Sequence, residues 1–251
     1  MHVAVLAKVV PDYEVPSGDF QLVNSRAHSR YNRMIGLYDE NAIEMGVQLK
    51  EKLSCALTII SYGAEDDVQF LRKAIAMGGD EMHLITGNSD DPVVIAANLK
   101  AAVESLQDVD LILAGRQSSD MDRGVVPGIL AGMLGYPFVP QVCKIEKQNG
   151  TWNVNQVTET GIRELQFAGK GVLSVTSVPE NLPRIPAVRA ILFAKKKPVK
   201  KVPEIKVPGM ELDELSVEIP KMESVCEFIS IEKIEETARI LLTRLKEERY
   251  L

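Results

Sequence analysis

The sequence predicts an α/β fold in which helices cover both faces of a doubly wound parallel sheet. Over residues 1–135, short apolar runs typical of buried parallel strands alternate with segments whose apolar residues recur at helical spacing. The connections between these segments are short, so each strand is expected to continue into a right-handed crossover. Beyond residue 136 the alternation stops and prolines recur, which predicts an extended C-terminal arm and a terminal helix.

The expected elements of the alternating part follow the apolar pattern. Strands are expected at residues 2–7, 55–60, 83–85 and 110–114, and helices at residues 39–53, 67–77, 91–106 and 125–134. Asp39 is expected to cap the first helix, and Asp91 with Pro92 opens the third. Gly135 is expected to end the fourth helix.

The C-terminal part carries different signals. Residues 152–154, 165–167 and 172–175 are short β-like runs, which we expect to form an antiparallel extension of the sheet. Residues 181–220 are predicted to be an extended arm with little core of its own. The last helix is expected at about residues 232–248, with an apolar stripe of Ile234, Ala238, Leu241, Leu242 and Leu245.

Composition argues against several classes of protein. The formal net charge of −6 and the 5% aromatic content disfavour a nucleic-acid binder. Cys55, Cys143 and Cys226 lack metal-ligand spacing and are odd in number, which indicates a reducing compartment. A strand that begins at residue 2 leaves no room for a signal peptide, and no apolar run reaches the ~18 residues of a membrane span. We therefore expect a cytoplasmic protein without a membrane span.

Residues 114–124 are the most informative segment, because they join the strand at 110–114 to the apolar helix at 125–134. A hydroxyl-rich turn before a helix presents free backbone N–H groups at the positive end of the helix dipole, which favours an anion. The turn lacks the Gly-Lys-Ser/Thr of nucleotide hydrolases and the Gly-x-Gly-x-x-Gly dinucleotide fingerprint. The pattern predicts an anion or nucleotide at the carboxyl edge of the sheet, where four loops converge: 7–12, 36–41, 61–65 and 115–124.

Five segments, in the right order and spacing, resemble the beta subunit of electron transfer flavoproteins. They are residues 7–12, 38–52, 71–80, 115–122 and 181–198. Residues 71–80 (Leu-Arg-Lys-Ala-Ile-Ala-Met-Gly-Gly-Asp) are similar to that family's Leu-Arg-x-Ala-x-Ala-Met-Gly-Ala-Asp segment. Residues 115–122 (Gly-Arg-Gln-Ser-Ser-Asp-Met-Asp) fall on its Gly-x-Gln-x-x-Asp-x-Asp nucleotide loop. The resemblance covers nearly the whole chain and implies a Rossmann-like sheet of the adenine nucleotide alpha hydrolase-like kind.

The resemblance implies a redox carrier subunit. Family members pair with a larger alpha subunit that holds the electron-carrying FAD, and the beta subunit binds AMP or, in electron-bifurcating members, a second FAD. They accept electrons from an acyl-CoA dehydrogenase or another flavin dehydrogenase, and bifurcating members oxidise NADH and reduce ferredoxin. Pro11-Asp12 is more like the bifurcating group, whereas residues 120–126 lack the Thr and Gln of its Asp-Gly-Asp-Thr-Ala-Gln-Val loop. FAD and AMP both remain open for this subunit.

The resemblance and the loop pattern together give a set of expected cofactor-binding residues. They are Leu6, Ala7, Lys8, Tyr38, Asp39, Tyr62, Gln117, Ser118, Ser119, Asp120, Asp122, Arg123, Gly124, Val125, Val126 and Gly128. Ser118 and Ser119 bind phosphate or cap a helix. Arg123 is a phosphate ligand or a surface charge. Asp120 and Asp122 are expected to bind loop amides, because they would repel a phosphate that they faced.

Four of these residues lie on other loops. Lys8 is expected to point into the ligand crevice, because a charge is unwelcome at the end of a buried strand. Tyr38 and Asp39 are expected near the adenosine, and Asp39 can also serve as the helix cap. Tyr62 packs on the adenine or simply closes the end of the sheet.

The run from Ile185 to Phe193 is too apolar to leave in water without a partner, and five lysines follow it within residues 195–201. We expect it to anchor a dehydrogenase or the alpha subunit, with the lysines steering the encounter. A buried strand with a basic tail is the alternative. The expected partner-binding residues are Ile185, Val188, Ile191, Leu192, Lys195, Lys196 and Lys197.

We therefore expect residues 1–180 to form a nucleotide-binding domain, and residues 181–251 to hold the recognition loop, the arm and a helix docked on the partner subunit. His2, His28 and His83 lie beside no acid or nucleophile pattern, so no catalytic residue and no metal site are expected. NADH oxidation would apply only to a bifurcating member. Two other functions stay open: a nucleotide-sensing or adenylate-transferring α/β protein, and a scaffold subunit whose loop no longer binds nucleotide.

Overall fold

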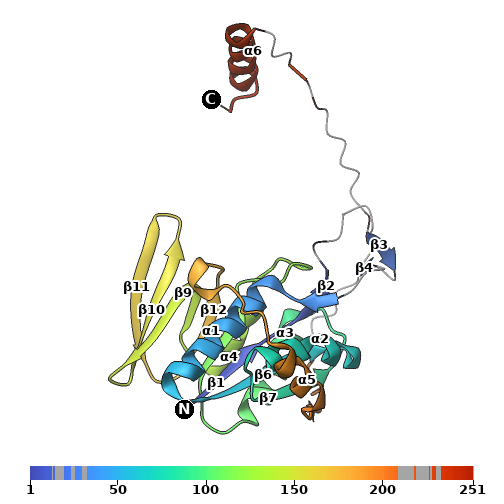
Figure 1. Ribbon diagram of the computed structural model, residues 1–251, viewed down its shortest axis with the longest axis vertical. Helices are drawn as coiled ribbons and strands as arrows, with labels where there is room; N and C mark the ends of the chain where they lie inside the picture. The colour runs from blue at the N-terminus through green and yellow to red at the C-terminus, as the bar shows by residue number, and fades with distance from the viewer. Residues whose placement is uncertain are drawn as a thin grey trace. The chain divides into compact units, whose positions relative to one another are not determined.

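The computed structural model describes residues 1–12, 14, 20–23, 26–29, 33–208, 218, 226, 228–229 and 233–250, in two compact units, Met1–Leu215 and Ser216–Leu251. The first unit contains a nine-stranded sheet in the order β11-β10-β9-β12-β8-β1-β6-β7-β13 (Figure 1). Its strands are β1 (His2–Leu6), β6 (Ala56–Gly63), β7 (Glu81–Thr86), β8 (Val109–Gly115), β9 (Phe138–Gln148), β10 (Thr151–Thr158), β11 (Gly161–Ala168), β12 (Gly171–Val175) and β13 (Lys200–Val202).

Successive side chains of each strand point to opposite sides, so the sheet has two apolar faces, and helices cover both of them. Helices α1 and α2 pack on one face, where Ile43 and Leu71 share a core with Leu57. Helices α3 and α4 pack on the other, where Leu99 and Leu130 share a core with Ile60. The expected doubly wound α/β fold is confirmed. The helices are α1 (Leu37–Leu53), α2 (Val68–Met77), α3 (Pro92–Glu104), α4 (Val126–Leu134) and α5 (Val188–Lys196), with short 3-10 turns η2 (Glu65–Asp67) and η3 (Pro179–Asn181).

The stretch between β1 and α1 contains two small antiparallel pairs. Strand β2 (Val9–Pro11) pairs with β5 (Arg33–Ile35), and β3 (Phe20–Val23) pairs with β4 (Arg26–Ser29). Val9, Val10 and Ile35 are buried, so the first pair extends the core beyond the carboxyl end of β1. The side chain of His28 lies outside the described residues.

The sequence predicted that residues 172–175 belong to an antiparallel extension, and this prediction is wrong. They lie in β12, which sits between β8 and β9 and pairs with both in parallel. All five residues of β12 are buried, as is typical of a central parallel strand with both faces covered. The antiparallel extension consists of β9, β10 and β11, which confirms the expectation for residues 152–154 and 165–167.

The arm is more regular than the expected extended chain at 181–220. Residues 188–196 form α5, which packs on α2, and Arg72 donates to the backbone carbonyls of Ala194 and, at 3.1 Å, Lys197. Strand β13 then pairs in parallel with β7 at the edge of the sheet. The alternative of a buried strand at 185–193 is also wrong, because a helix against α2 buries only Ala194 fully and leaves Val188 exposed.

The second unit contains helix α6 (Ile234–Glu247), which confirms the terminal amphipathic helix expected at about 232–248. Its apolar residues Ile234, Leu241 and Leu242 are exposed. Among the described residues, no helix is both long enough and apolar enough to cross a membrane.

Candidate functional site at the carboxyl edge of the sheet

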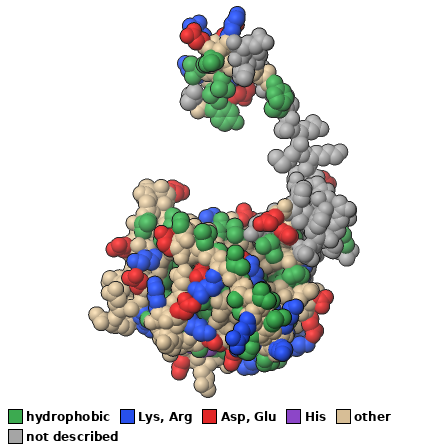
Figure 2. Space-filling view, viewed as in Figure 1, with side chains coloured by type: hydrophobic (Ala, Val, Ile, Leu, Met, Phe, Trp, Pro, Cys, Tyr) green, Lys and Arg blue, Asp and Glu red, His purple; other side chains and the backbone are tan. Residues whose placement is uncertain are grey.

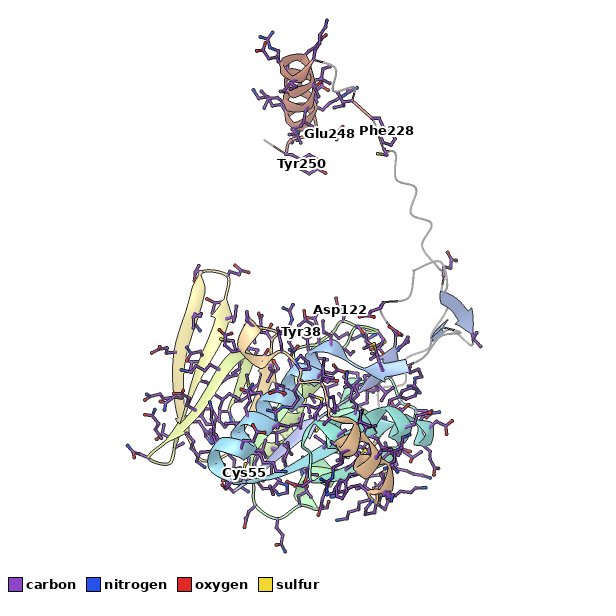
Figure 3. All side chains as sticks on the ribbon, viewed as in Figure 1. Tyr38, Cys55, Asp122, Phe228, Glu248 and Tyr250 are labelled. Atoms are coloured by element: carbon purple, nitrogen blue, oxygen red, sulfur yellow. The ribbon has the colours of Figure 1, made fainter. Side chains whose placement is uncertain are left out.

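The winding direction of the sheet reverses between β1 and β8. From β1 the chain continues to β6 and β7 on one side, whereas β8 is followed by β12 and β9 on the other. Open α/β sheets bind ligands in the crevice outside the carboxyl ends of the strands at such a point. Figure 3 shows Tyr38 and Asp122 at the same end of the first unit, opposite the end where Cys55 lies.

Asp39 joins the ends of β1 and β8 at this crevice. Its Oδ2 accepts the backbone N–H of Lys8 at 2.8 Å, and its Oδ1 accepts the backbone N–H of Gly115 at 2.9 Å. The sequence predicted that Asp39 caps α1. This prediction is wrong, because the N-cap is Gly36. Asp39 stands in the first turn of the helix, and its carboxylate turns to the strand ends instead.

The contact between Asp39 and Gly115 leaves no room for a side chain on the glycine. A Cβ at Gly115 would lie 2.4 Å from Oδ1 of Asp39 and 2.8 Å from the carbonyl carbon of Tyr38. Asp39 is 8% exposed, and burial raises its pKa to about 7. The two amide donors and the ammonium of Lys8 oppose this rise.

The loop at 116–124 is closed by its own hydrogen bonds. The backbone N–H of Asp122 donates to the carbonyl of Ser118 at 2.8 Å, and the side-chain amide of Gln117 donates to the Asp122 carboxylate. Gly124 has φ +63°, and a Cβ there would lie 2.6 Å from the carbonyl oxygen of Arg116. Glycine is therefore required where the loop turns into α4.

Charged side chains of the loop contact the neighbouring elements. The ammonium of Lys8, which the sequence predicts to point into the ligand crevice, pairs with Asp120 of the loop at 2.6 Å. The guanidinium of Arg116 lies 5.0 Å from the ring centre of Tyr38. Asp120 and Asp122 thus have side-chain partners, where the sequence predicted loop amides. Arg123 is exposed, and in the described part of the chain no hydrogen bond or ion pair holds it.

These residues fit a phosphate group. The N-cap of α4 is Val125, and the first N–H groups of a helix have no partner within it, so Val125, Val126 and Gly128 offer backbone donors. Ser118 is partly exposed, and Ser119 and Arg123 are exposed, in the loop that leads to this helix. The nearby carboxylates are already paired. Within the described ranges, no group of three or more His, Cys, Asp or Glu side chains is placed to hold a metal ion.

Two expected site residues have other roles in the structure. The hydroxyl of Tyr62 donates to Glu204 at 2.6 Å and accepts the N–H of Ser89 at 3.1 Å, an arrangement that closes the end of the sheet. Leu6 is 6% exposed and belongs to the core beneath α3 and α4. The hydrogen bonds of Asp39 with Lys8 and Gly115 join three of the four expected loops, those at 7–12, 36–41 and 115–124.

The expected partner-binding residues lie together on the arm. Ile185 is 95% exposed and Val188 is 74% exposed, with Ile191 and Leu192 also exposed. Lys195 and Lys196 are exposed at the end of α5. Lys197 is tied to the body instead, because its ammonium donates to the carbonyl of Asp80. Figure 2 shows positive and negative side chains interspersed over the visible face of this unit.

Two arginines that make defined contacts in the structure are not among the residues predicted from the sequence for this crevice, Arg116 in its loop and Arg184 on the side of α1. Arg116 directly follows the glycine that ends β8, and only its position in the loop could have singled it out. Arg184 pairs with Glu44 and Glu51, which stand seven residues apart on α1. That spacing places two carboxylates on one helix face and is a signal that the sequence does carry.

The fold defines a class of protein: a doubly wound α/β protein whose β8–α4 loop lies at the point where the winding reverses. The family model of the electron transfer flavoprotein domain matches residues 26–207. The electron transfer flavoprotein subunit beta of Mycobacterium leprae is 30% identical over 228 residues, 86% of this chain and 84% of that protein. That of Bacillus subtilis is 31% identical over 204 residues, 80% and 77% of the two chains. The probable electron transfer flavoprotein subunit beta of Saccharomyces cerevisiae is 28% identical over 259 residues, 96% and 98% of the two chains. The chain belongs to the electron transfer flavoprotein beta subunit family.

Proposed function

We propose that this chain is the beta subunit of a heterodimeric electron transfer flavoprotein, and that it binds an adenine nucleotide beside β1 and β8. The observation that carries the proposal is the Asp39 carboxylate, which holds the end of β8 and the loop after it against the end of β1. This arrangement brings the first turn of α4 to the crevice. The names of the relatives support the redox role.

In this proposal each group has a defined task. Backbone N–H groups at Val125, Val126 and Gly128 bind the phosphate, with the hydroxyls of Ser118 and Ser119. Arg123 adds a charged, fork-shaped donor. The flavin supplies the redox chemistry when bound, so the residues of this chain bind and orient the nucleotide and need no catalytic acid or base.

Lys8 and Asp120 set the charge at the mouth of the crevice. Their ion pair leaves Lys8 neutralised, with side-chain exposures of 37% and 22%. A phosphate that approaches α4 competes with the Asp120 carboxylate for the same ammonium. In this proposal Tyr38, whose ring centre lies 5.0 Å from the guanidinium of Arg116, borders the adenosine.

The partners follow from the exposed surfaces. The apolar residues around α5 would dock an acyl-CoA dehydrogenase or another flavin dehydrogenase, with Lys195 and Lys196 steering the encounter. The exposed apolar stripe of α6 would dock on the alpha subunit. The thiols of Cys55, Cys143 and Cys226 are free, in keeping with the reducing cytoplasm where we place the protein.

The test is to co-purify the chain with its alpha subunit, record the visible spectrum, and count FAD and AMP per heterodimer. One FAD with one AMP supports a simple electron carrier. Two FAD without AMP supports bifurcation, in which NADH is oxidised and ferredoxin reduced. A heterodimer with no nucleotide on this subunit would refute the proposal in favour of a scaffold, and ATP turnover by the chain would favour an adenylate-transferring protein.

A further inference from the structure

Arg184 fastens the segment before α5 to the side of α1. Its Nε donates to Oε2 of Glu44 at 2.8 Å and its Nη2 to Oε1 of the same carboxylate at 2.9 Å. Its Nη1 donates to Oε1 of Glu51 at 2.6 Å. The Glu44 side chain is 6% exposed and that of Arg184 is 34% exposed, so this bidentate pair is partly shielded from water. Burial by itself would raise the pKa of Glu44, but the hydrogen bonds from Arg184 and Gln48 outweigh it and lower this pKa below its usual value. The hydrogen bond from Arg184 also lowers the pKa of Glu51. Both glutamates are therefore ionised at neutral pH.

Amide side chains continue this attachment along the same face of α1. The Nδ2 of Asn41 donates to the carbonyl of Asn181 at 3.0 Å, and both residues are buried. The Nε2 of Gln48 donates to the carbonyl of Glu180 at 2.9 Å. Asn41, Glu44, Gln48 and Glu51 follow helical spacing, so one face of α1 holds residues 180–184.

The attachment ends where the exposed apolar residues begin. Ile185, directly after Arg184, is 95% exposed, and Val188 is 74% exposed. Pro183 and Pro186 flank this point and fix their own φ angles. The far end of α5 is held by Arg72. The exposed residues are therefore presented on a segment that is held at both ends.

We propose that Arg184 is a positioning residue for partner docking: its pairing with Glu44 and Glu51 pre-orders residues 185–193 so that a dehydrogenase meets them already in place. This inference rests on the proposed function. A segment that must be ordered on binding lowers affinity, because its conformational entropy is lost at that moment. Loss of Arg184 should therefore weaken encounter with the dehydrogenase, and leave electron transfer within the formed complex unchanged.

The experiment uses the intact heterodimer and a purified acyl-CoA dehydrogenase as the probe. Arg184→Gln should raise the KM for the dehydrogenase about tenfold, equivalent to ~1.4 kcal/mol, with kcat and flavin content unchanged. Arg184→Lys should restore only part of the affinity, because an ammonium cannot form the bidentate pair. Arg163→Gln is the matched control, since it removes an equal charge from an exposed position on β11 and should leave KM unchanged.

Hydrogen exchange of the same heterodimers gives a second readout. Amides of residues 182–193 should exchange faster in Arg184→Gln, and to a smaller extent in Glu51→Gln, which breaks only the outer ion pair. Faster exchange with an unchanged KM would overturn the inference, as would a lost kcat together with lost flavin. A wild-type heterodimer that accepts no electrons from the dehydrogenase would instead contradict the proposed function itself.

Discussion

The carboxylate of Asp39 accepts the backbone N–H of Gly115 at 2.9 Å, although 76 positions separate the two residues in the sequence. The other carboxylate oxygen binds the N–H of Lys8. One side chain therefore joins the start of α1, the end of β1 and the end of β8. The position of the loop that follows β8, and with it the start of α4, depends on this contact.

Gly115→Ala should destabilise the fold by about 1–3 kcal/mol, because the new Cβ would overlap Asp39. It should also reduce nucleotide retention, since the loop can no longer approach α1. Gly132→Ala is the control: nothing lies within 4 Å of a Cβ at Gly132 in α4, and this change should be neutral or slightly stabilising. Urea unfolding of both variants measures the difference, and equal stabilities would contradict the role given to Gly115.

Asp39 should give the free energy of unfolding a distinctive pH dependence. Its pKa of about 7 lies above the ordinary value of 3.8, so between these values the folded protein binds the proton more tightly. The stability that Asp39 contributes is full below pH 3.8 and is lost as the pH rises through about 7. The slope reaches at most ~1.4 kcal/mol per pH unit.

The measurement compares wild type with Asp39→Asn, which cannot titrate, between pH 5 and pH 8. Stability of the variant relative to wild type should improve as the pH rises, even if the variant is less stable at pH 5 because its amide nitrogen cannot accept one of the two N–H groups. Other titrating groups are common to both proteins and cancel. A constant difference across this range would mean that Asp39 is already ionised throughout.

Arg123→Ala should lower nucleotide retention by about tenfold or more, because one charged donor to the phosphate is lost. Its stability should stay within ~0.5 kcal/mol of wild type, since the side chain is exposed. The heterodimer is dialysed and its bound nucleotide is counted, with Arg163→Ala as the control for the loss of a positive charge. Unchanged retention would remove Arg123 from the site.

Val188→Asp should slow electron transfer from the dehydrogenase through a higher KM, because a charge would be desolvated at the centre of the docking surface. Val188 is 74% exposed, so the substitution should leave the fold and the flavin spectrum intact. Ile162→Asp on β11, at a site that is 65% exposed, makes the same change elsewhere and should have little effect. Loss of flavin in Val188→Asp would point to a folding role.

Much of the fold follows from local sequence patterns. The four crossover helices were predictable because their apolar residues recur at helical spacing, and Asp91 caps α3 as predicted by accepting the N–H of Val93 at 2.8 Å. The strands before them are short apolar runs, which signal burial on both faces. The loop at 115–124 could be singled out from its residue types, which are typical of an anion site; anion binding there stays a prediction.

Other features depend on segments that meet only in the folded chain. The apolar residues 172–175 predict a buried strand from the sequence. Its parallel pairing depends on the position of β12 between β8 and β9, which only the folded chain shows. Residues 188–193 are apolar enough for a buried strand. In the structure they belong to helix α5, which packs on α2 and leaves most of its apolar side chains exposed.

The sequence by itself determined the class of fold, the order of its elements and the family, because periodicity and residue type are properties of neighbouring positions. The tertiary structure decided which partner each polar side chain takes. Asp39 binds two strand ends where it was expected to cap its helix, and Arg184 binds glutamates 133 and 140 positions away. Such pairings follow from the packing of whole elements, because the hydrogen-bonding capacity of a side chain does not specify which distant group will reach it.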